Sequence, residues 1–246
     1  MKKSKILDRL IPLLPKIHSF HSPYTDLHSF LEIVARQEVE TLFSEKDDPN
    51  LTFHFGPFGD LVFPYVNMGA VDSLNLFDLD ELIIFSFYWI NRKKYRNVLD
   101  LGANIGLHSI ILGKCGYNVR SYEPDPLHFK TLENNLVLND CLNVEAINAA
   151  ISYEDGEKEF IRVCGNTTGN HISGSKDNPY GDLDKFPVKI KSIEPMLQWA
   201  DLIKMDIEGH EKDILNKTPT HIWKNADIIL EVQDEKSAEI IYHKFE

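Results

Sequence analysis

Short apolar segments separated by helical stretches dominate the chain from residue 97 onward. They cover residues 97–101, 118–123, 143–151, 201–207 and 227–232. Strands that alternate with helices form right-handed βαβ units around a parallel sheet. The pattern therefore predicts an α/β fold over residues 97–246, with a mostly parallel sheet and helices on both faces.

Residues 152–192 interrupt this alternation after the third expected strand and are rich in Gly, Asn, Asp and Ser. Within them, "EKEFIRV" and "FPVKIKSI" predict a pair of inserted strands. The long polar segment 164–185 connects these strands, and connections of that length are usually functional or mobile. We expect the inserted segment to contribute to the shape of a ligand pocket.

The first part of the chain, residues 1–96, follows a different pattern. Residues 5–45 have helical spacing, and 78–90 are apolar almost all round, which predicts a buried helix. Between them, residues 51–69 carry two aromatic runs around Gly-Pro-Phe-Gly, a pattern that favours a β-hairpin. We expect a helical and β-hairpin cap that covers the core and helps to close a pocket.

Composition limits the class of protein and of partner. Hydrophobic residues make up 43% of the 246 residues, enough for a sizeable core. The net charge of −12, with no run of Lys and Arg, argues against nucleic acid as a partner. Three scattered cysteines, Cys115, Cys141 and Cys164, indicate reduced thiols and a cytoplasmic location. No apolar run approaches the roughly 18 residues of a membrane span, and the N-terminus lacks the pattern of a signal peptide.

The segment "VLDLGANIGLHSI" contains the strongest functional signal. It places Gly102, Asn104 and Gly106 between a buried strand and a helix that starts near Leu107. Glycines let a ligand approach the backbone, and a helix N-terminus offers free N–H groups. Glu123 ends the next strand, where a carboxylate can accept both hydroxyls of a ribose. The combination predicts a nucleoside-cofactor site, although the glycine loop alone is compatible with an ordinary tight turn.

The spacing of the glycines bears on which nucleoside binds. A dinucleotide fingerprint has the pattern G-x-G-x-x-G, but here Asn104 stands between Gly102 and Gly106, and the third glycine is absent. Asp100, just before the loop, suits a cofactor with a cationic centre. These features favour S-adenosylmethionine over a nicotinamide cofactor, and a nicotinamide-dependent oxidoreductase is the alternative enzyme.

Three ordered motifs, "VLDLGANIGLHSI", "SYEPDPLHFKTLENNLVLN" and "DLIKMDIEGHEKDIL", resemble the FkbM family of S-adenosylmethionine-dependent methyltransferases over residues 97–233. The resemblance implies a class I methyltransferase fold and methylation of hydroxyls on small molecules such as polyketides or on sugars. It implies that the cofactor is lined by four residues of the first motif, with Glu123 on the ribose. These four are Gly102, Ala103, Asn104 and Gly106.

The third motif supplies the candidate catalytic carboxylates. Asp206 and Glu208 follow the fourth expected strand, where one would orient cofactor or substrate and the other act as base. Their alternative role is to cap the next helix. His108, His171 and His210 rank below them as bases, and no metal is expected because the acidic residues lack a recognisable ligand spacing.

Two further expectations concern Asp125 and the end of the chain. Asp125 precedes Pro126 and is a natural helix N-cap, with contact to the adenosine as its functional interpretation. Related methyltransferases usually continue into a final antiparallel strand pair, whereas this sequence stops at Glu246, as expected of either a natural short form or a truncated one. The segment 227–232 would then be a sheet edge, which predicts self-association or cover by residues 1–45.

A non-catalytic protein that only binds S-adenosylmethionine is the remaining alternative function.

Overall fold

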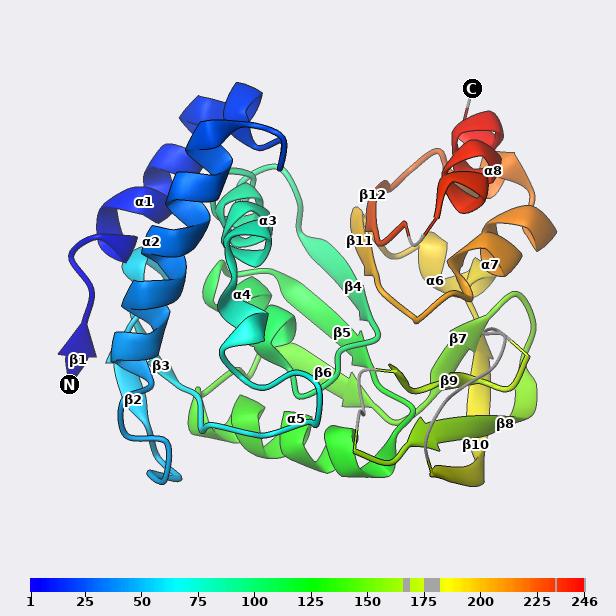
Figure 1. Ribbon diagram of the computed structural model, residues 1–246. Coiled ribbons are helices and arrows are strands. Elements are labelled where there is room, and N and C mark those ends of the chain that lie inside the picture. Colours follow the sequence, from blue (N-terminus) through cyan, green and yellow to red (C-terminus); the bar gives the residue numbers. More distant parts are fainter. Residues whose placement is uncertain (166–168, 175–181, 233, 246) are drawn as a thin grey trace. The chain divides into compact units, whose positions relative to one another are not determined.

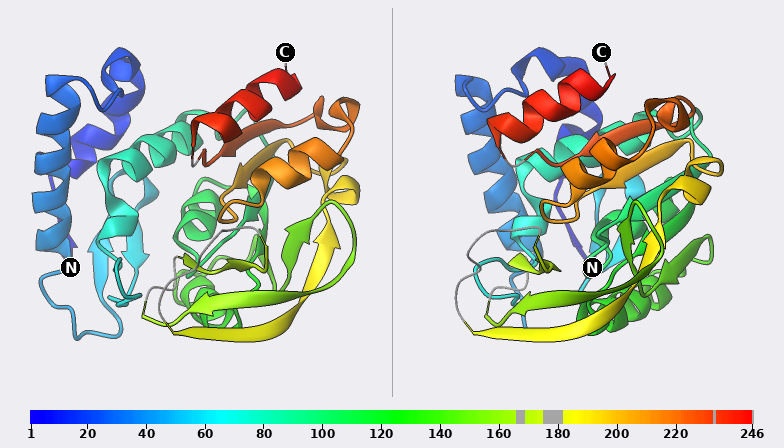
Figure 2. Two further views of the ribbon diagram at one scale, coloured as in Figure 1. Left: turned by 45° about the vertical axis from the view of Figure 1, so that its right-hand side comes forward. Right: turned by 90° about the vertical axis from the view of Figure 1, so that its right-hand side faces the viewer.

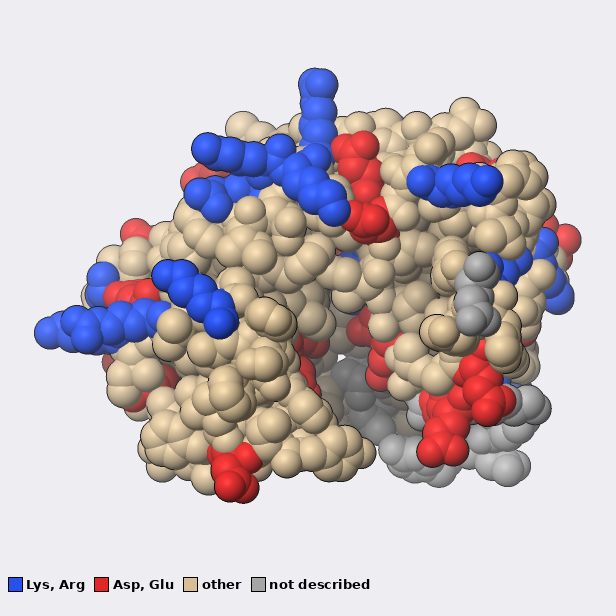
Figure 3. Space-filling model, turned by 90° about the horizontal axis from the view of Figure 1, so that it is seen from above, with Lys and Arg blue, Asp and Glu red and all other residues tan. Residues whose placement is uncertain are grey.

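The chain divides into two units, residues 1–94 and 95–246, in the computed structural model. The structure describes residues 1–165, 169–174, 182–232 and 234–245. Among these residues, no helix has both the length and the apolar character that crossing a membrane requires. On the face drawn in Figure 3, Lys and Arg side chains lie among acidic and uncharged ones.

The first unit contains the predicted hairpin and helices. Its elements are β1 (Lys2–Lys3), α1 (Leu7–Leu13), η1 (Leu14–Phe20), α2 (Asp26–Leu42), β2 (Thr52–His54), η2 (Gly56–Phe58), β3 (Asp60–Val62), η3 (Asn75–Phe77) and α3 (Leu79–Ile90). The antiparallel pair β2–β3 confirms the hairpin, although its strands are shorter than the aromatic runs. The core is aromatic: Phe43 and Phe55 each pack their rings against Phe77, with centroids 5.4 and 5.2 Å apart.

The second unit is built on a five-stranded sheet. Its strands are β4 (Asn97–Leu101), β5 (Asn118–Tyr122), β6 (Val144–Ile147), β11 (Leu202–Met205) and β12 (Asp227–Leu230). They lie in the order β12-β11-β4-β5-β6, and every neighbouring pair is parallel. The predicted parallel sheet is confirmed.

Helices cover both faces of this sheet, as expected (Figure 1). On one face lie α4 (Leu107–Lys114) and α5 (Pro126–Leu138); on the other lie α6 (Glu194–Leu197), α7 (Glu211–Lys217) and η5 (Thr220–Trp223), and α8 (Glu235–Phe245) packs against α7. Buried Leu99, Ile203 and Met205 pack against the α6–α7 side. The chain winds outward from β4 to β6 and later returns beside β4 as β11. The switch point therefore lies between β4 and β11, where open α/β sheets bind ligands.

A second, four-stranded sheet follows β6. It consists of β7 (Ala150–Ser152), β8 (Gly156–Val163), β9 (His171–Ile172) and β10 (Leu183–Ser192), in the order β7-β10-β8-β9. The antiparallel pair β8–β10 confirms the two inserted strands and forms the long ribbon seen in Figure 2. Residues 166–168 and 175–181 of the predicted polar loop lie outside the described residues.

The single strand predicted over 143–151 is wrong. The Nδ2 of Asn148 donates to the carbonyls of Glu123 (2.8 Å) and Pro124 (3.1 Å), and the amide of Ala149 donates to Ile147. These bonds turn the chain, so β6 ends in the first sheet and β7 begins in the second. The apolar run looks continuous in the sequence because residues 149–151, which follow the turn, are buried.

The loops after β4 and β11 pack directly on each other. The two strands are in register, with Leu101 opposite Met205. Gly102 has φ +78°, and a Cβ there would lie 1.8 Å from the carbonyl oxygen of Asp206. Only glycine therefore lets these two loops approach so closely.

Replacing Gly102 by alanine tests this contact, with Gly116→Ala as a matched control. Gly116 has φ +89° but open space around it. Both substitutions should lose about 1–2 kcal/mol of unfolding free energy because of the left-handed backbone. Gly102→Ala should lose at least about 2 kcal/mol more, because its methyl group meets backbone. Urea denaturation of both variants measures the difference, and equal losses would contradict the close packing.

Candidate functional site

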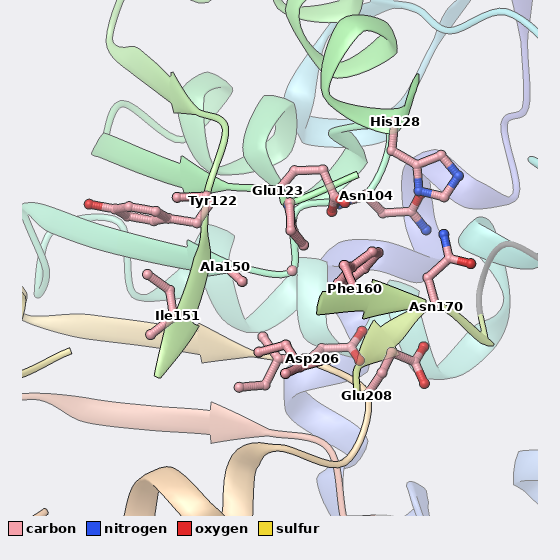
Figure 4. A pocket seen from close by; sticks show the side chains of 15 residues that line it. Asn104, Tyr122, Glu123, His128, Ala150, Ile151, Phe160, Asn170, Asp206 and Glu208 are labelled. Carbon is pink, nitrogen blue, oxygen red and sulfur yellow. The ribbon is translucent and has the colours of Figure 1, made fainter. Parts of the chain in front are cut away.

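A pocket opens at the carboxyl ends of β4, β5 and β11, where the switch point predicts one (Figure 4). It encloses about 620 Å³ of non-atom space, its open mouth included. Residues of both sheets line it: Gly102, Asn104, Tyr122, Glu123, Pro124, His128, Ala149, Ala150, Ile151, Phe160, Asn170, Ile172, Asp206, Ile207 and Glu208. The inserted sheet is thus one wall of the pocket.

The glycine loop adopts the geometry expected of a ligand-binding turn. The amides of Gly102 and Ala103 both donate to the carbonyl of Tyr122, which joins the loop to the end of β5. Gly106, with φ +92°, is the N-cap of α4, and a Cβ there would lie 2.4 Å from the side chain of Leu132. Gly102 and Asn104 line the pocket, whereas Ala103 and Gly106 shape the loop from outside the lining set.

Asn104 presents an acceptor without a partner. Its backbone is left-handed, with φ +51°, and its amide donates to Oε2 of Glu123 at 2.8 Å. Within the described part of the chain, its buried Oδ1 accepts no hydrogen bond. A buried polar atom of this kind in a pocket wall is suited to a ligand donor.

Glu123 lies beside Asn104 in the pocket wall (Figure 4). Its carboxylate accepts from two backbone amides, Asn104 on Oε2 and Asp125 on Oε1, each at 2.8 Å. The residue is only 5% exposed, and burial raises its pKa from 4.5 to about 8 against the opposing effect of the two amides. When ionised, the carboxylate has about four acceptor positions, so two remain for ligand hydroxyls.

Asp100 lies beneath the loop rather than in the pocket. It is fully buried, and its Oδ2 accepts from the hydroxyl of Ser109 at 2.6 Å. Its Oδ1 lies 3.6 Å from Nζ of Lys204, which donates to the carbonyl of Gly102 at 3.1 Å. Asp100 is absent from the residues that line the pocket.

Asp125 is likewise occupied by contacts within the protein. It caps α5 as predicted, since Oδ1 accepts from the amide of Leu127 at 2.8 Å. The remaining acceptor positions face Arg162, which donates to both oxygens at 2.7 Å, and Asn170, which donates to Oδ2 at 2.9 Å. Burial raises its pKa, but the hydrogen bonds from Arg162 and Leu127 outweigh burial and lower it overall. Asp125 is fully buried and does not line the pocket.

Both predicted carboxylates of the third motif, Asp206 and Glu208, line the pocket. Asp206 lies with Oδ2 3.5 Å from Nζ of Lys204, and its amide donates to the carbonyl of Leu101. Glu208 has φ +59°, a backbone conformation that residues other than glycine seldom adopt and that is found at functional sites.

A residue not singled out in the sequence, Glu211, holds the loop that carries these carboxylates. It begins α7, and its carboxylate accepts from the amides of Ile207 (2.7 Å) and Gly209 (2.9 Å). One oxygen each from Asp206, Glu211 and Glu231 lie within 4.8 Å of one another. Because both oxygens of Glu211 already accept backbone amides, its carboxylate is accounted for by the structure of the loop.

The three histidines named as candidate bases lie outside the set of lining residues. His108 is half-buried in the first turn of α4. His171 is buried in β9, with Nδ1 2.8 Å from the carbonyl of Gly169. Nε2 of His210 is 2.9 Å from the hydroxyl of Ser152, and burial lowers its pKa to about 4.

His128, Asn170 and Phe160 complete the pocket but carry no local sequence signal. His128, on α5, is 9% exposed, and burial lowers its pKa, which leaves a neutral imidazole at pH 7. Phe160 and Asn170 come from the inserted segment, more than thirty residues from the glycine loop. The alternation of 157–163 could have placed Phe160 on a buried face, but nothing in it identifies which cavity that face meets.

Residues 100–244 match the model of the methyltransferase FkbM domain. The chain is also similar to two curated proteins. Methyltransferase sdnD of Sordaria araneosa is 27% identical, over 52% of this chain and 62% of the relative. Methyltransferase 1 of Beauveria bassiana is 25% identical, over 56% of this chain and 65% of the relative. The chain thus spans less than two thirds of the length of either relative.

Solved structures with a similar arrangement include a precorrin-6y C5,15-methyltransferase from Geobacter metallireducens. It is 13% identical, with a TM-score of 0.40, over 68% of this chain and 72% of that one.

The raised pKa of Glu123 predicts a specific pH dependence of stability. The folded chain holds this proton more tightly than the unfolded chain, so ionisation of Glu123 lowers the unfolding free energy as pH rises from about 4.5 to about 8. Glu123→Gln removes that loss. Denaturation of both chains at pH 5, 7 and 9 should show the variant gaining stability relative to wild type with pH. A difference that is independent of pH would contradict the assignment.

Proposed function

The chain belongs to the methyltransferase FkbM family, and on that premise we propose that it transfers a methyl group from S-adenosylmethionine to a hydroxyl oxygen of a small molecule or a sugar. The observation that carries the proposal is Glu123, a buried carboxylate with free acceptor positions at the end of β5, beside the glycine loop. This is the place and the chemistry that a ribose requires.

The other lining residues suit the rest of this cofactor. The unpartnered Oδ1 of Asn104 can accept from a ligand N–H or O–H group. Asp206 and Glu208 bring negative charge to the pocket, which favours a ligand with ammonium and sulfonium groups. Apolar Ile151, Phe160 and Ile172 offer a surface for a flat base. When bound, the cofactor supplies an electrophilic methyl group.

The chain's own contribution is mainly positioning. Methyl transfer is an in-line displacement at carbon, in which the acceptor oxygen forms a bond as the carbon–sulfur bond breaks. Holding the reactants in line can supply about 7–11 kcal/mol in favourable cases. A hydroxyl must also lose its proton, and a base within reach contributes about 10²–10⁴-fold. We assign that role to Asp206 or Glu208, with Lys204 fixing the orientation of Asp206.

Two alternatives predict different binding and turnover. A nicotinamide-dependent oxidoreductase would bind NADH, and a non-catalytic binding protein would bind S-adenosylmethionine without transferring its methyl group. Isothermal titration with S-adenosylmethionine, S-adenosylhomocysteine and NADH measures which cofactor binds and so distinguishes the proposed methyltransferase from an oxidoreductase. Transfer of a tritiated methyl group to a panel of hydroxylated polyketides and sugars distinguishes the proposed methyltransferase from a protein that only binds the cofactor. Binding of NADH alone, or cofactor binding without transfer to any acceptor, would contradict the proposal.

Glu123→Ala should weaken binding of S-adenosylhomocysteine by about 10–100-fold. At pH 9, above the pKa of about 8, Glu123 is ionised, and losing this charged acceptor of ribose hydroxyls costs roughly 1.5–3 kcal/mol. The matched control is Glu145→Ala, which removes a carboxylate from the adjacent strand β6 whose partner is Arg120 on the surface. Titration calorimetry should give wild-type affinity for the control. Unchanged affinity in Glu123→Ala would remove the ribose assignment.

Asp206→Asn and Glu208→Gln should each lower turnover at least tenfold without loss of the fold. Each replaces a carboxylate by an amide of equal size, so proton acceptance and charge are removed while packing is kept. Glu194→Gln, at an exposed position of α6, serves as the control. Initial rates of methyl transfer measure the effect, and circular dichroism checks the fold. Wild-type rates in both variants would show that these carboxylates only shape the loop.

A further inference from the structure

A buried ion pair beside the pocket joins the inserted sheet to the main domain. Arg162 on β8 donates from Nε and Nη2 to the two oxygens of Asp125, each at 2.7 Å. Asp125 is fully buried, whereas the arginine side chain is 15% exposed. The guanidinium also lies 4.7 Å from the ring centre of Phe186, and its Nη1 donates to Oδ2 of Asp184 at 2.9 Å. A bidentate pair of this kind fixes both distance and orientation.

The same strand supplies a wall of the pocket. Phe160 lies two residues before Arg162 on β8, so both project from the same side of the strand. Phe160 and, from β9, Ile172 line the pocket. Asn170 also lines it and donates to Asp125, while its Oδ1 accepts from the amide of Val163. The position of this wall therefore depends on the contacts of Asp125.

Asp125 also contacts the opposite side of the site. Its amide donates to Oε1 of Glu123 at 2.8 Å, and its carboxylate caps α5. Arg162, Asp125 and Glu123 thus form a continuous path from the inserted sheet to the proposed ribose acceptor. Removing the arginine would leave a buried carboxylate without its cation, a costly arrangement that the loop would relieve by moving.

We propose that Arg162 is a positioning residue for the cofactor: through Asp125 it sets the separation between Glu123 and the wall that carries Phe160. The proposal rests on the proposed function, since the ligand is the same nucleoside. Arg162 itself does not line the pocket, so its effect on binding is transmitted through these neighbours.

Titration of the full chain with S-adenosylhomocysteine tests the proposal without knowledge of the methyl acceptor. Arg162→Gln should weaken binding at least tenfold. Arg162→Lys keeps the positive charge but cannot donate two parallel hydrogen bonds to Asp125, so its affinity should lie between those of wild type and Arg162→Gln. Arg120→Gln is the matched control, because Arg120 pairs with Glu145 at 3.1 Å and lies 4.3 Å from the ring centre of Trp199, away from the pocket. The control should bind within twofold of wild type.

A double-mutant cycle with Phe160→Ala separates positioning from a general loss of stability. If Arg162 acts by placing Phe160, then Arg162→Gln should cost less than threefold in affinity once Phe160 is alanine. Equal costs in both backgrounds would overturn the proposal, as would binding by Arg162→Gln within twofold of wild type. If Arg162→Gln does not fold, the same cycle with Arg162→Lys decides the question.

The outcome also separates this proposal from the one on which it rests. A wild-type chain that binds neither S-adenosylmethionine nor S-adenosylhomocysteine overturns the proposed function and this inference together. A wild-type chain that binds, with Arg162 variants that bind equally well, overturns this inference alone and leaves the proposed function in place.

Discussion

The buried ammonium of Lys204 connects the parts of the molecule from which the site is made. It donates to the carbonyl of Gly102 at 3.1 Å and lies 3.6 and 3.5 Å from the carboxylates of Asp100 and Asp206. A buried cation requires such partners, because desolvation without them is too costly. The glycine loop after β4 and the acidic loop after β11 are therefore held together at one end of the sheet. Gly102 and Asp206, on the two sides of this junction, both line the pocket.

The elements that could be predicted are those whose signal is local. Apolar runs placed β4, β5, β11 and β12 to within a few residues, and their alternation with helices fixed a parallel sheet. From that sheet follows the position of the glycine loop and of Glu123, because parallel strands bring their carboxyl ends to one edge. Gly102, Asn104, Glu123, Asp206 and Glu208 all line the pocket for this reason.

The features that escaped prediction depend on partners far along the chain. Asp100 and Asp125 were expected to contact a cofactor. In the structure Asp100 lies beside the ammonium of Lys204, and Asp125 pairs with the guanidinium of Arg162. Arg162 lies 37 residues from Asp125, and no periodicity reports a pairing at that distance. The division of the third strand depends on the side chain of Asn148, whose bonds reach back to the end of β5. Each of these outcomes is decided by tertiary contacts that local patterns do not encode.

The backbone of Glu208 has a consequence for how this sequence can vary. A left-handed conformation at a residue with a Cβ costs of the order of 1 kcal/mol, and glycine would relieve it. A library of variants selected only for resistance to heat would therefore accumulate glycine or asparagine at this position. A library selected for turnover would retain glutamate there if the carboxylate has the role assigned to it. Under the proposed role of Glu208, stability and turnover select different residues at position 208, and comparison of the two libraries would reveal the conflict.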